Sequence, residues 1–385
     1  FYQTMKQLNL IFLSTLLIFT SCASGPANRN NKSFNANDSI TVHTIANADT
    51  ITLVFAGDIM QHQAQLDAAK TENGYDYSSY FKNIDSLIHN SDLSIGNLET
   101  PIGTPPYSGY PMFNAPKELA KACKDAGFDI LLTANNHSVD RYSKGITNTI
   151  LTLDSLKIDH LGTYLNKDER DTHHPLIKEV KGYKIAFFNY TYGTNGIAIP
   201  EPNVVNLIDT LEIKRDLSQA DQKGADLKIV CIHWGDEYHT KPNKAQKRLA
   251  QWLIKNGVDH IIGSHPHVIQ PIHLEIDSIT DKKSVIAYSL GNFISNMSKT
   301  ETDGGLLIKL DLFKKNNKWD CQVYYTLVWT GRPIITNEKN FTLYPALGEN
   351  NELSKNAYNK LIIFRKHANK VMKHNSDSIK PWNSK

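Results

Sequence analysis

The feature that most constrains this chain is a regular alternation of short β-branched runs with helical segments, which begins near residue 49. The runs predict strands over residues 51–56, 93–96, 130–134, 184–190, 227–233, 260–263, 285–290, 306–312 and 321–329. Helical periodicity predicts helices over residues 77–90, 116–126, 143–156, 211–223 and 244–256. Such alternation is typical of an α/β protein with helices layered on central sheets. Because no helix separates the last two strands, we expect part of the sheet to be antiparallel.

Polar side chains gather where five of the predicted strands end. These ends read GDIMQH at 57–62, GNLETP at 96–101, ANNH at 134–137, HWGDEY at 233–238 and GSHPH at 263–267. Ligand sites in layered α/β folds lie beyond the carboxyl ends of strands, so we expect the five ends to converge. Asp58 alone could be a turn or helix cap, and His137 alone could be a surface histidine. Together, carboxylate, amide and imidazole groups predict a site for a divalent metal such as Zn, Mn or Fe.

With YSLGNF at 288–293, these motifs stand in an order that resembles the CapA, or poly-γ-glutamate capsule synthesis, family. That family is similar to the calcineurin-like metallophosphatases, and the resemblance covers about residues 50–300. It implies a four-layer α/β/β/α sandwich of the metallo-dependent phosphatase type. It also implies a metal centre between the edges of the two sheets.

The resemblance implies a role for each motif residue. His137 matches the general acid, and the implied metal ligands are Asp58, Glu99, Asn136, His233, His265 and His267. Met60 stands where the wider superfamily has a histidine, and Glu99 replaces its usual bridging aspartate, so either one or two divalent ions fit the pattern. His62 is a candidate substitute for the missing histidine. Other candidates for metal binding or for supporting the ligands are Asn97, Asn135, Glu237 and Asn292.

These roles imply a metal-dependent hydrolase of the phosphoesterase type, in which activated water attacks phosphorus and His137 protonates the leaving oxygen. The expected setting is the biosynthesis of capsule, poly-γ-glutamate or another surface polymer. Two alternatives remain. One is a phosphodiesterase or phosphatase for another envelope phosphate ester. The other is a non-catalytic tethered subunit of a membrane polymer synthase, whose other subunits would then be the partners.

The N-terminal residues predict export and a lipid anchor. An apolar run at residues 8–19 follows Lys6 and fits a secretory signal, but it is too short for a comfortable membrane span. It leads into Ser21 and Cys22, which resemble a bacterial lipobox with Cys22 as the lipidated residue. An ordinary signal peptide or an uncleaved anchor is the alternative. We expect a signal peptide over 1–21, a flexible tether over 22–48, and a protein lipid-anchored in the bacterial cell envelope.

For the rest of the chain we expect a CapA-like metallophosphatase domain over 49–335 and a C-terminal extension over 336–385. The extension contains an amphipathic helix predicted over 353–372. Lysine and arginine number 42 against 39 aspartate and glutamate residues, which gives a net charge of +3. This balance argues against a nucleic-acid partner and gives little support to binding of an anionic polymer. The substrate is instead expected to be a phosphate ester or a surface polymer.

Overall fold

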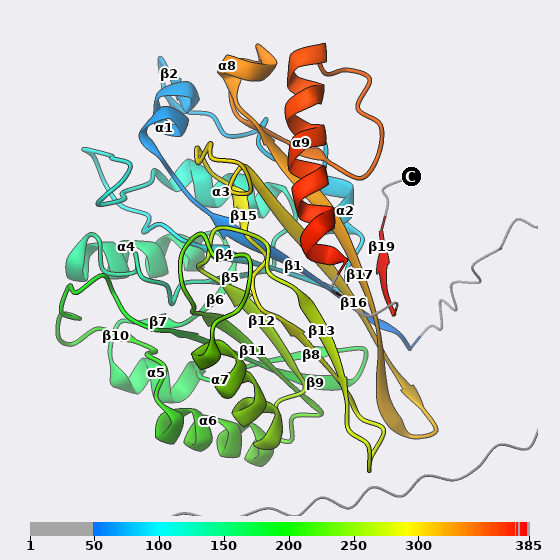
Figure 1. The fold of residues 1–385 in the computed structure, drawn as a ribbon. Coiled ribbons are helices and arrows are strands. Elements are labelled where there is room, and N and C mark those ends of the chain that lie inside the picture. The colour runs from blue at the N-terminus through cyan, green and yellow to red at the C-terminus, as the bar shows by residue number, and fades with distance from the viewer. Residues whose placement is uncertain (1–48, 374, 376–377, 383–385) are drawn as a thin grey trace, which may run out of the picture. The chain divides into compact units, whose positions relative to one another are not determined.

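The computed structural model describes residues 49–373, 375 and 378–382 (Figure 1). The predicted signal peptide over 1–21, Cys22 and the predicted tether over 22–48 all lie outside these residues. Among the residues that the structure describes, no helix has the length and apolar character needed to cross a membrane.

Two large sheets organise the described chain. The larger sheet has the strand order β18-β17-β16-β1-β4-β5-β6, with β15 beside β1 and β19 beside β17. Its strands are β1 (Ile51–Ile59), β4 (Leu93–Leu98), β5 (Ile130–Leu132), β6 (Asp159–Leu161), β15 (Asn292–Ile294), β16 (Gly304–Lys315), β17 (Lys318–Gly331), β18 (Thr342–Pro345) and β19 (Ile379–Pro381). The strands β1, β4, β5 and β6 are parallel, whereas β16 pairs antiparallel with both β1 and β17. The expected antiparallel part is therefore confirmed.

The smaller sheet has the order β13-β14-β12-β11-β9-β8. Its strands are β8 (Leu176–Val180), β9 (Tyr183–Thr191), β11 (Leu227–His233), β12 (His260–Ser264), β13 (Ile272–Ile276) and β14 (Lys283–Ala287). Two short pairs join β2 (Lys70–Thr71) to β3 (Gly74–Tyr75) and β7 (Thr163–Tyr164) to β10 (Val204–Val205). The helices are α1 (Gln63–Ala69), α2 (Asp85–His89), α3 (Lys117–Asp125), α4 (Tyr142–Ser155), α5 (Lys167–His173), α6 (Thr210–Gln222), α7 (Lys244–Lys255), α8 (Pro333–Thr336) and α9 (Lys355–Met372).

Three buried clusters show that the layers are stacked helix, sheet, sheet, helix. One apolar cluster joins the inner faces of the two sheets, with Phe55 and Ile95 on one side and Phe187 and Ile229 on the other. A second packs α2 and α3 against the outer face of the larger sheet. A third packs α6 and α7 against the outer face of the smaller sheet, and Figure 1 shows these helices on that side. The predicted four-layer α/β/β/α sandwich is thus confirmed.

One predicted helix is wrong over most of its length. Only Asp85–His89 is α-helical within the predicted range 77–90. The residues before it form turns, in which the Tyr80 N–H donates to the Tyr77 carbonyl at 3.0 Å. The Tyr80 carbonyl accepts from the N–H of Leu343 in β18 at 2.9 Å. A strand from the far end of the chain therefore supplies the hydrogen bond that an α-helix would have made within itself.

The C-terminal residues complete the inner core. The expected amphipathic helix is α9, which buries Ala357, Leu361, Phe364, Ala368 and Met372. These side chains join the same cluster that lies between the two sheets, and Figure 1 shows α9 beside β17. Phe364 packs directly on Gly304 in β16, where a Cβ atom would lie 2.7 Å from the Phe364 ring. The cysteines at 123, 231 and 321 are buried free thiols.

Candidate metal centre

The predicted site residues meet at the carboxyl ends of strands from both sheets. Asp58 lies near the end of β1 and Glu99 directly follows β4, which pairs parallel with β1. On the other sheet, His233 ends β11, and His265 and His267 follow β12. All five side chains are buried. The convergence expected from the strand ends is therefore observed.

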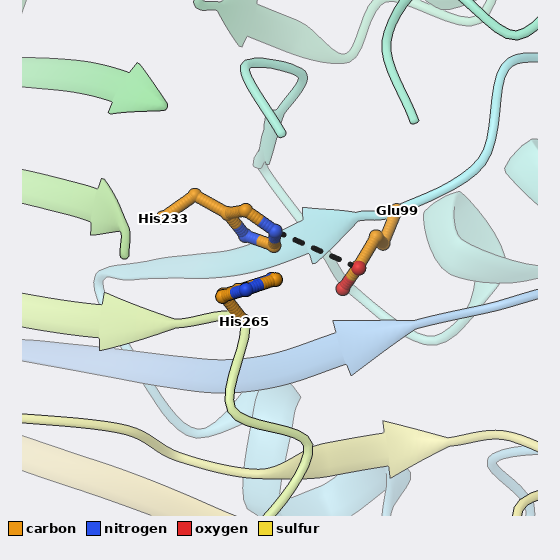
Figure 2. Close-up of side chains that lie close together, drawn as sticks. All are labelled: Glu99, His233 and His265. Atoms are coloured by element: carbon orange, nitrogen blue, oxygen red, sulfur yellow. Dashed lines mark ion pairs between the residues drawn. The ribbon is translucent and has the colours of Figure 1, made fainter. Parts of the chain in front are cut away.

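A first ligand cluster consists of Glu99, His233 and His265. Their donor atoms lie within 4.8 Å of one another, and Glu99 Oε1 is 3.6 Å from His233 Nε2. Figure 2 shows the three side chains pointing toward one another, the carboxylate from one sheet and the two imidazoles from the other. One carboxylate and two imidazoles form a donor set that suits zinc, manganese or iron.

A second ligand cluster consists of Asp58, Glu99 and His267, whose donor atoms also lie within 4.8 Å of one another. His267 Nδ1 is 3.4 Å from Asp58 Oδ2, and His267 Nε2 is 3.9 Å from Glu99 Oε1. Glu99 belongs to both clusters. The arrangement can therefore hold two cations that share one carboxylate, in the place where the sequence resemblance implies a bridging group.

Buried polar atoms without hydrogen-bond partners test whether a cation fits. Within the described residues, Asp58 Oδ2, Glu99 Oε1 and His265 Nδ1 are buried and have no hydrogen-bond partner. Such atoms are costly in a protein interior unless a partner or an ion satisfies them. All three are typical metal-ligand atoms, so the residues present fit divalent cations.

The electrostatics of the centre point the same way. Burial and the nearby Asp58 raise the pKa of Glu99 well above its ordinary value. Burial lowers the pKa of His233 well below its ordinary value and lowers that of His265 to about 4. The site therefore disfavours both a lone carboxylate charge and imidazolium charges. Bound cations would stabilise the carboxylate charge. They would also bind neutral imidazoles, which is the form that the lowered histidine pKa values favour.

Amide side chains orient the ligands. Asn97 Nδ2 donates to Asp58 Oδ1 at 2.8 Å, and Asn292 Oδ1 lies 3.0 Å from His267 Nδ1. Asn136 Oδ1 lies 2.7 Å from His233 Nε2, the atom that faces Glu99, so this amide oxygen can join the first cluster. Ser264 Oγ lies 2.9 Å from His233 Nδ1. A proton held at that nitrogen would leave Nε2 free to bind a metal.

A histidine–aspartate pair lies beside the ligands. His137 Nδ1 is 2.8 Å from Asp140 Oδ2, and both side chains are buried. The Phe113 N–H donates to the same carboxylate oxygen at 2.8 Å, and the Phe113 ring lies 4.6 Å from the His137 ring. These contacts fix the imidazole plane, and the residues that the structure describes make no hydrogen bond to its Nε2.

The backbone at the His265-Pro266-His267 motif is strained. His265 and His267 have φ values of 97° and 59°, in the left-handed region that non-glycine residues rarely adopt. Strain of this kind persists where surrounding structure holds it and is concentrated at functional sites. Here it places two imidazoles, separated by a single residue, in the two different clusters.

The other predicted residues surround the clusters. Asn135 fixes the turn before His137, because its Nδ2 donates to the Leu98 carbonyl and its Oδ1 accepts from the His137 N–H. Glu237 is exposed and adds to the raised pKa of Glu99. His62 belongs to neither cluster, and its Nδ1 lies 3.2 Å from Gln65 Oε1. Burial lowers the pKa of His62 to about 4.

Two supporting residues were not predicted from the sequence. Asp140 follows His137 by three residues, which places it on the same turn, and this spacing is the signal that could have found it. Ser264 stands inside the GSHPH motif but does not belong to a residue type that binds these metals strongly. Its role is visible only from its distance to His233.

Comparisons with known proteins agree with the resemblance in the sequence. The sequence model of the family described as "Bacterial capsule synthesis protein PGA_cap" matches residues 52–297. The chain is 30% identical over 275 residues to "Capsule biosynthesis protein CapA" of Bacillus anthracis, a match that covers 69% of this chain and 64% of that protein. It is 30% identical over 276 residues to "PGA biosynthesis protein CapA" of Bacillus subtilis (strain 168), covering 70% of this chain and 69% of that protein.

The chain thus spans less than two thirds of the Bacillus anthracis protein. Among solved structures, the calcineurin-like phosphoesterase YfkN from Bacillus subtilis is similar over 83% of this chain and 98% of its own, with 11% identity and a TM-score of 0.41.

Proposed function

This chain belongs to the bacterial capsule synthesis family PGA_cap, and from that premise we propose that it is a metal-dependent phosphoesterase that acts in making a bacterial surface polymer. One observation carries the proposal. Two buried ligand clusters share Glu99 and lie next to the His137–Asp140 pair. Metal ligands alone would suit a structural site, whereas an adjacent, oriented imidazole suits proton transfer.

The ligand residues would hold the cations in defined places. Glu99, His233 and His265, with the amide oxygen of Asn136, would hold one ion, and Asp58, Glu99 and His267 would hold the other. The chemistry that divalent cations supply in such a site is Lewis acidity, which activates water and neutralises charge on phosphate oxygens. The ligand atoms fit zinc, manganese and iron alike.

The residues of the chain itself handle the proton. Asp140 holds His137 through Nδ1, so the proton available for transfer is on Nε2 of the imidazolium. His137 would give this proton to the leaving oxygen as the ester bond breaks, and the Asp140 carboxylate would stabilise the imidazolium beforehand. Phe113 packs against the His137 ring in an edge-to-face contact, which limits the rotation of the imidazole. Asn97 and Asn292 would keep Asp58 and His267 in place during the cycle.

The proposed location is the cell envelope, with a lipid on Cys22 and the domain outside the cytoplasm. The apolar run over 8–19 and the small residues before Cys22 support this location. The two Bacillus relatives are named for capsule or PGA biosynthesis, which supports a role in surface-polymer production. A partner membrane synthase is part of the same proposal.

Hydrolysis of bis(4-nitrophenyl) phosphate by the Mn-loaded chain tests the proposal. We expect turnover by the wild type, and loss of turnover in His137→Ala and in His265→Ala. Glu179→Gln is a matched control, because Glu179 is exposed on β8 and far from the clusters in the sequence. Bound Mn without turnover of any phosphate ester would contradict the enzyme and favour a non-catalytic synthase subunit.

A further inference from the structure

Exposed tyrosines are concentrated at the metal centre. Four tyrosines stand among the exposed large hydrophobic side chains of the described residues, namely Tyr110, Tyr142, Tyr192 and Tyr238. Tyr192 and Tyr238 contact ligand imidazoles, and Tyr110 contacts the Phe113 ring that packs on His137. The three tyrosines come from three separate segments of the chain. Exposed aromatic side chains that gather in one place are typical of binding sites, so their shared position is informative.

Tyr192 borders the first ligand cluster. It follows β9, and its N–H donates to the His233 carbonyl at 3.0 Å. Its ring lies 4.6 Å from the His265 ring and nearly parallel to the His233 ring, at 6.3 Å and 8°. Tyr192 as a whole is nevertheless 48% exposed. One face thus covers the ligands while much of the side chain stays open to a bound molecule.

Tyr238 borders the second ligand cluster. Its backbone is fixed in the left-handed region with φ of 64°, and its N–H donates to the Pro266 carbonyl at 2.8 Å. Its ring lies 6.1 Å from the His267 ring and is 46% exposed. The hydrogen bond joins the backbone of Tyr238 to that of the His265-Pro266-His267 motif, so the Tyr238 ring is held beside the second cluster.

Tyr110 borders the proton-transfer pair. Its ring, 72% exposed, lies 6.2 Å from Phe113, which in turn contacts His137. The loop that carries it is held by Asn114, whose Nδ2 donates to the Thr104 and Pro106 carbonyls at 2.8 Å each. The three rings therefore lie beside the centre on backbone that is held by hydrogen bonds, as a preorganised binding rim requires.

Two exposed carboxylates lie at this rim beside Tyr238. Asp236 and Glu237 are both exposed next to Tyr238, whereas Lys299 lies 5.5 Å from the Tyr238 ring. Glu237 directly precedes Tyr238 in the chain. A polyglutamate chain would meet these carboxylates, and like charges repel. A neutral ring with hydroxyl groups would stack on tyrosine and donate hydrogen bonds to the carboxylates.

We propose that Tyr110, Tyr192 and Tyr238 form a rim that binds a sugar ring, so that the substrate is a glycosyl phosphate ester rather than a polyanionic peptide. This inference rests on the proposed function for the phosphate half of the substrate. The sugar ring stacks on the tyrosines and its hydroxyls donate to Glu237, while its phosphate points into the ligand clusters.

Glucose 1-phosphate and glycerol 1-phosphate provide the test, because they share a phosphate monoester and differ in the ring. Their binding to the full chain is measured by titration calorimetry with Mn present and absent. The chain carries His137→Asn, which prevents turnover. We expect glucose 1-phosphate to bind at least about tenfold more tightly. Tyr238→Ala should remove most of this preference, and Tyr238→Phe should retain it.

Tyr142→Ala is the matched control, because Tyr142 is exposed but makes no ring contact with the centre in the described residues. It should leave the preference intact. Equal binding of the two esters, no binding of glucose 1-phosphate, or a preference that survives alanine at all three rim positions would each overturn the rim. A sugar preference in a wild type that hydrolyses neither ester would instead support the rim and contradict the phosphoesterase.

Discussion

Replacing Glu99 with glutamine should change stability in opposite directions with and without metal. In the metal-free protein, burial and Asp58 hold the pKa of Glu99 well above its ordinary value of 4.5. Each unit of such a shift corresponds to about 1.4 kcal/mol of folding free energy once the group must ionise. Glutamine keeps the shape and removes the charge. Metal-free Glu99→Gln should therefore be more stable than the wild type near neutral pH.

The stability difference between the metal-free variant and the wild type should depend on pH. A carboxyl with a raised pKa in the folded state stabilises the fold fully below its unfolded pKa, and this contribution is lost as pH rises toward the folded pKa. The advantage of the metal-free variant should therefore grow as pH rises above about 4.5.

With metal the order should reverse. A cation at about one hundred times its Kd stabilises the folded state by about 2.7 kcal/mol per site. That amount shifts Tm by roughly 3–6 °C in a domain of this size. Because Glu99 belongs to both clusters, the variant should lose this stabilisation at both sites.

Calorimetric unfolding at pH 7, in EDTA and in excess Mn, measures both effects. Glu179→Gln, an exposed change of the same chemistry, should leave Tm unchanged in each condition. A metal-free Glu99→Gln protein that unfolds at lower temperature than the wild type would refute the electrostatic reasoning. An unchanged Tm shift on adding Mn would refute the shared ligand.

Three further predictions follow from the structure. Asp140→Asn should lower kcat for bis(4-nitrophenyl) phosphate by about a hundredfold in steady-state assays. Adding His137→Ala to this variant should lower kcat little further, because the two residues act together. Additive losses of kcat would contradict a functional His137–Asp140 pair. Burial lowers the pKa of His260 to about 4. The contribution of His260 to stability should therefore be full above pH 6.5 and fall by up to about 3 kcal/mol as pH drops toward 4. Urea titrations should show that the unfolding free energy of His260→Gln depends less steeply on pH over this range. Phe364→Ala should cost about 3–5 kcal/mol in urea unfolding, whereas Ile363→Ala on the exposed side of α9 should cost under about 0.5 kcal/mol; equal costs would contradict the packing of α9 on the core.

The sequence predicted the parts of the fold that depend on local patterns. Apolar runs such as 227–233 were found with their observed bounds, because a buried parallel strand is a continuous apolar run. The site could be predicted because its carboxylate and imidazole ligands lie at or just beyond the carboxyl ends of strands. Residues 77–84 could not be predicted, because β18 supplies their backbone hydrogen bond from over 250 residues away. Helix α5 (Lys167–His173) was missed, since its residues are almost wholly polar and buried only at Arg170.

The finer geometry of the site depends on distances between segments. The sharing of Glu99 between two clusters requires the two stacked sheets to bring the carboxyl ends of their strands together, and no local pattern encodes that stacking. Tyr110, Tyr192 and Tyr238 lie in three loops with no common spacing, so only their ring contacts identify them as one rim.

The number of Mn ions per chain, measured by elemental analysis after dialysis, tests the central claim most directly. The shared-carboxylate centre predicts two ions in the wild type and in Glu179→Gln. It predicts about one in Asp58→Asn and one in His265→Ala, because each of these residues belongs to a single cluster. Absence of Mn from the wild type, or the same number in all four proteins, would contradict the centre described here.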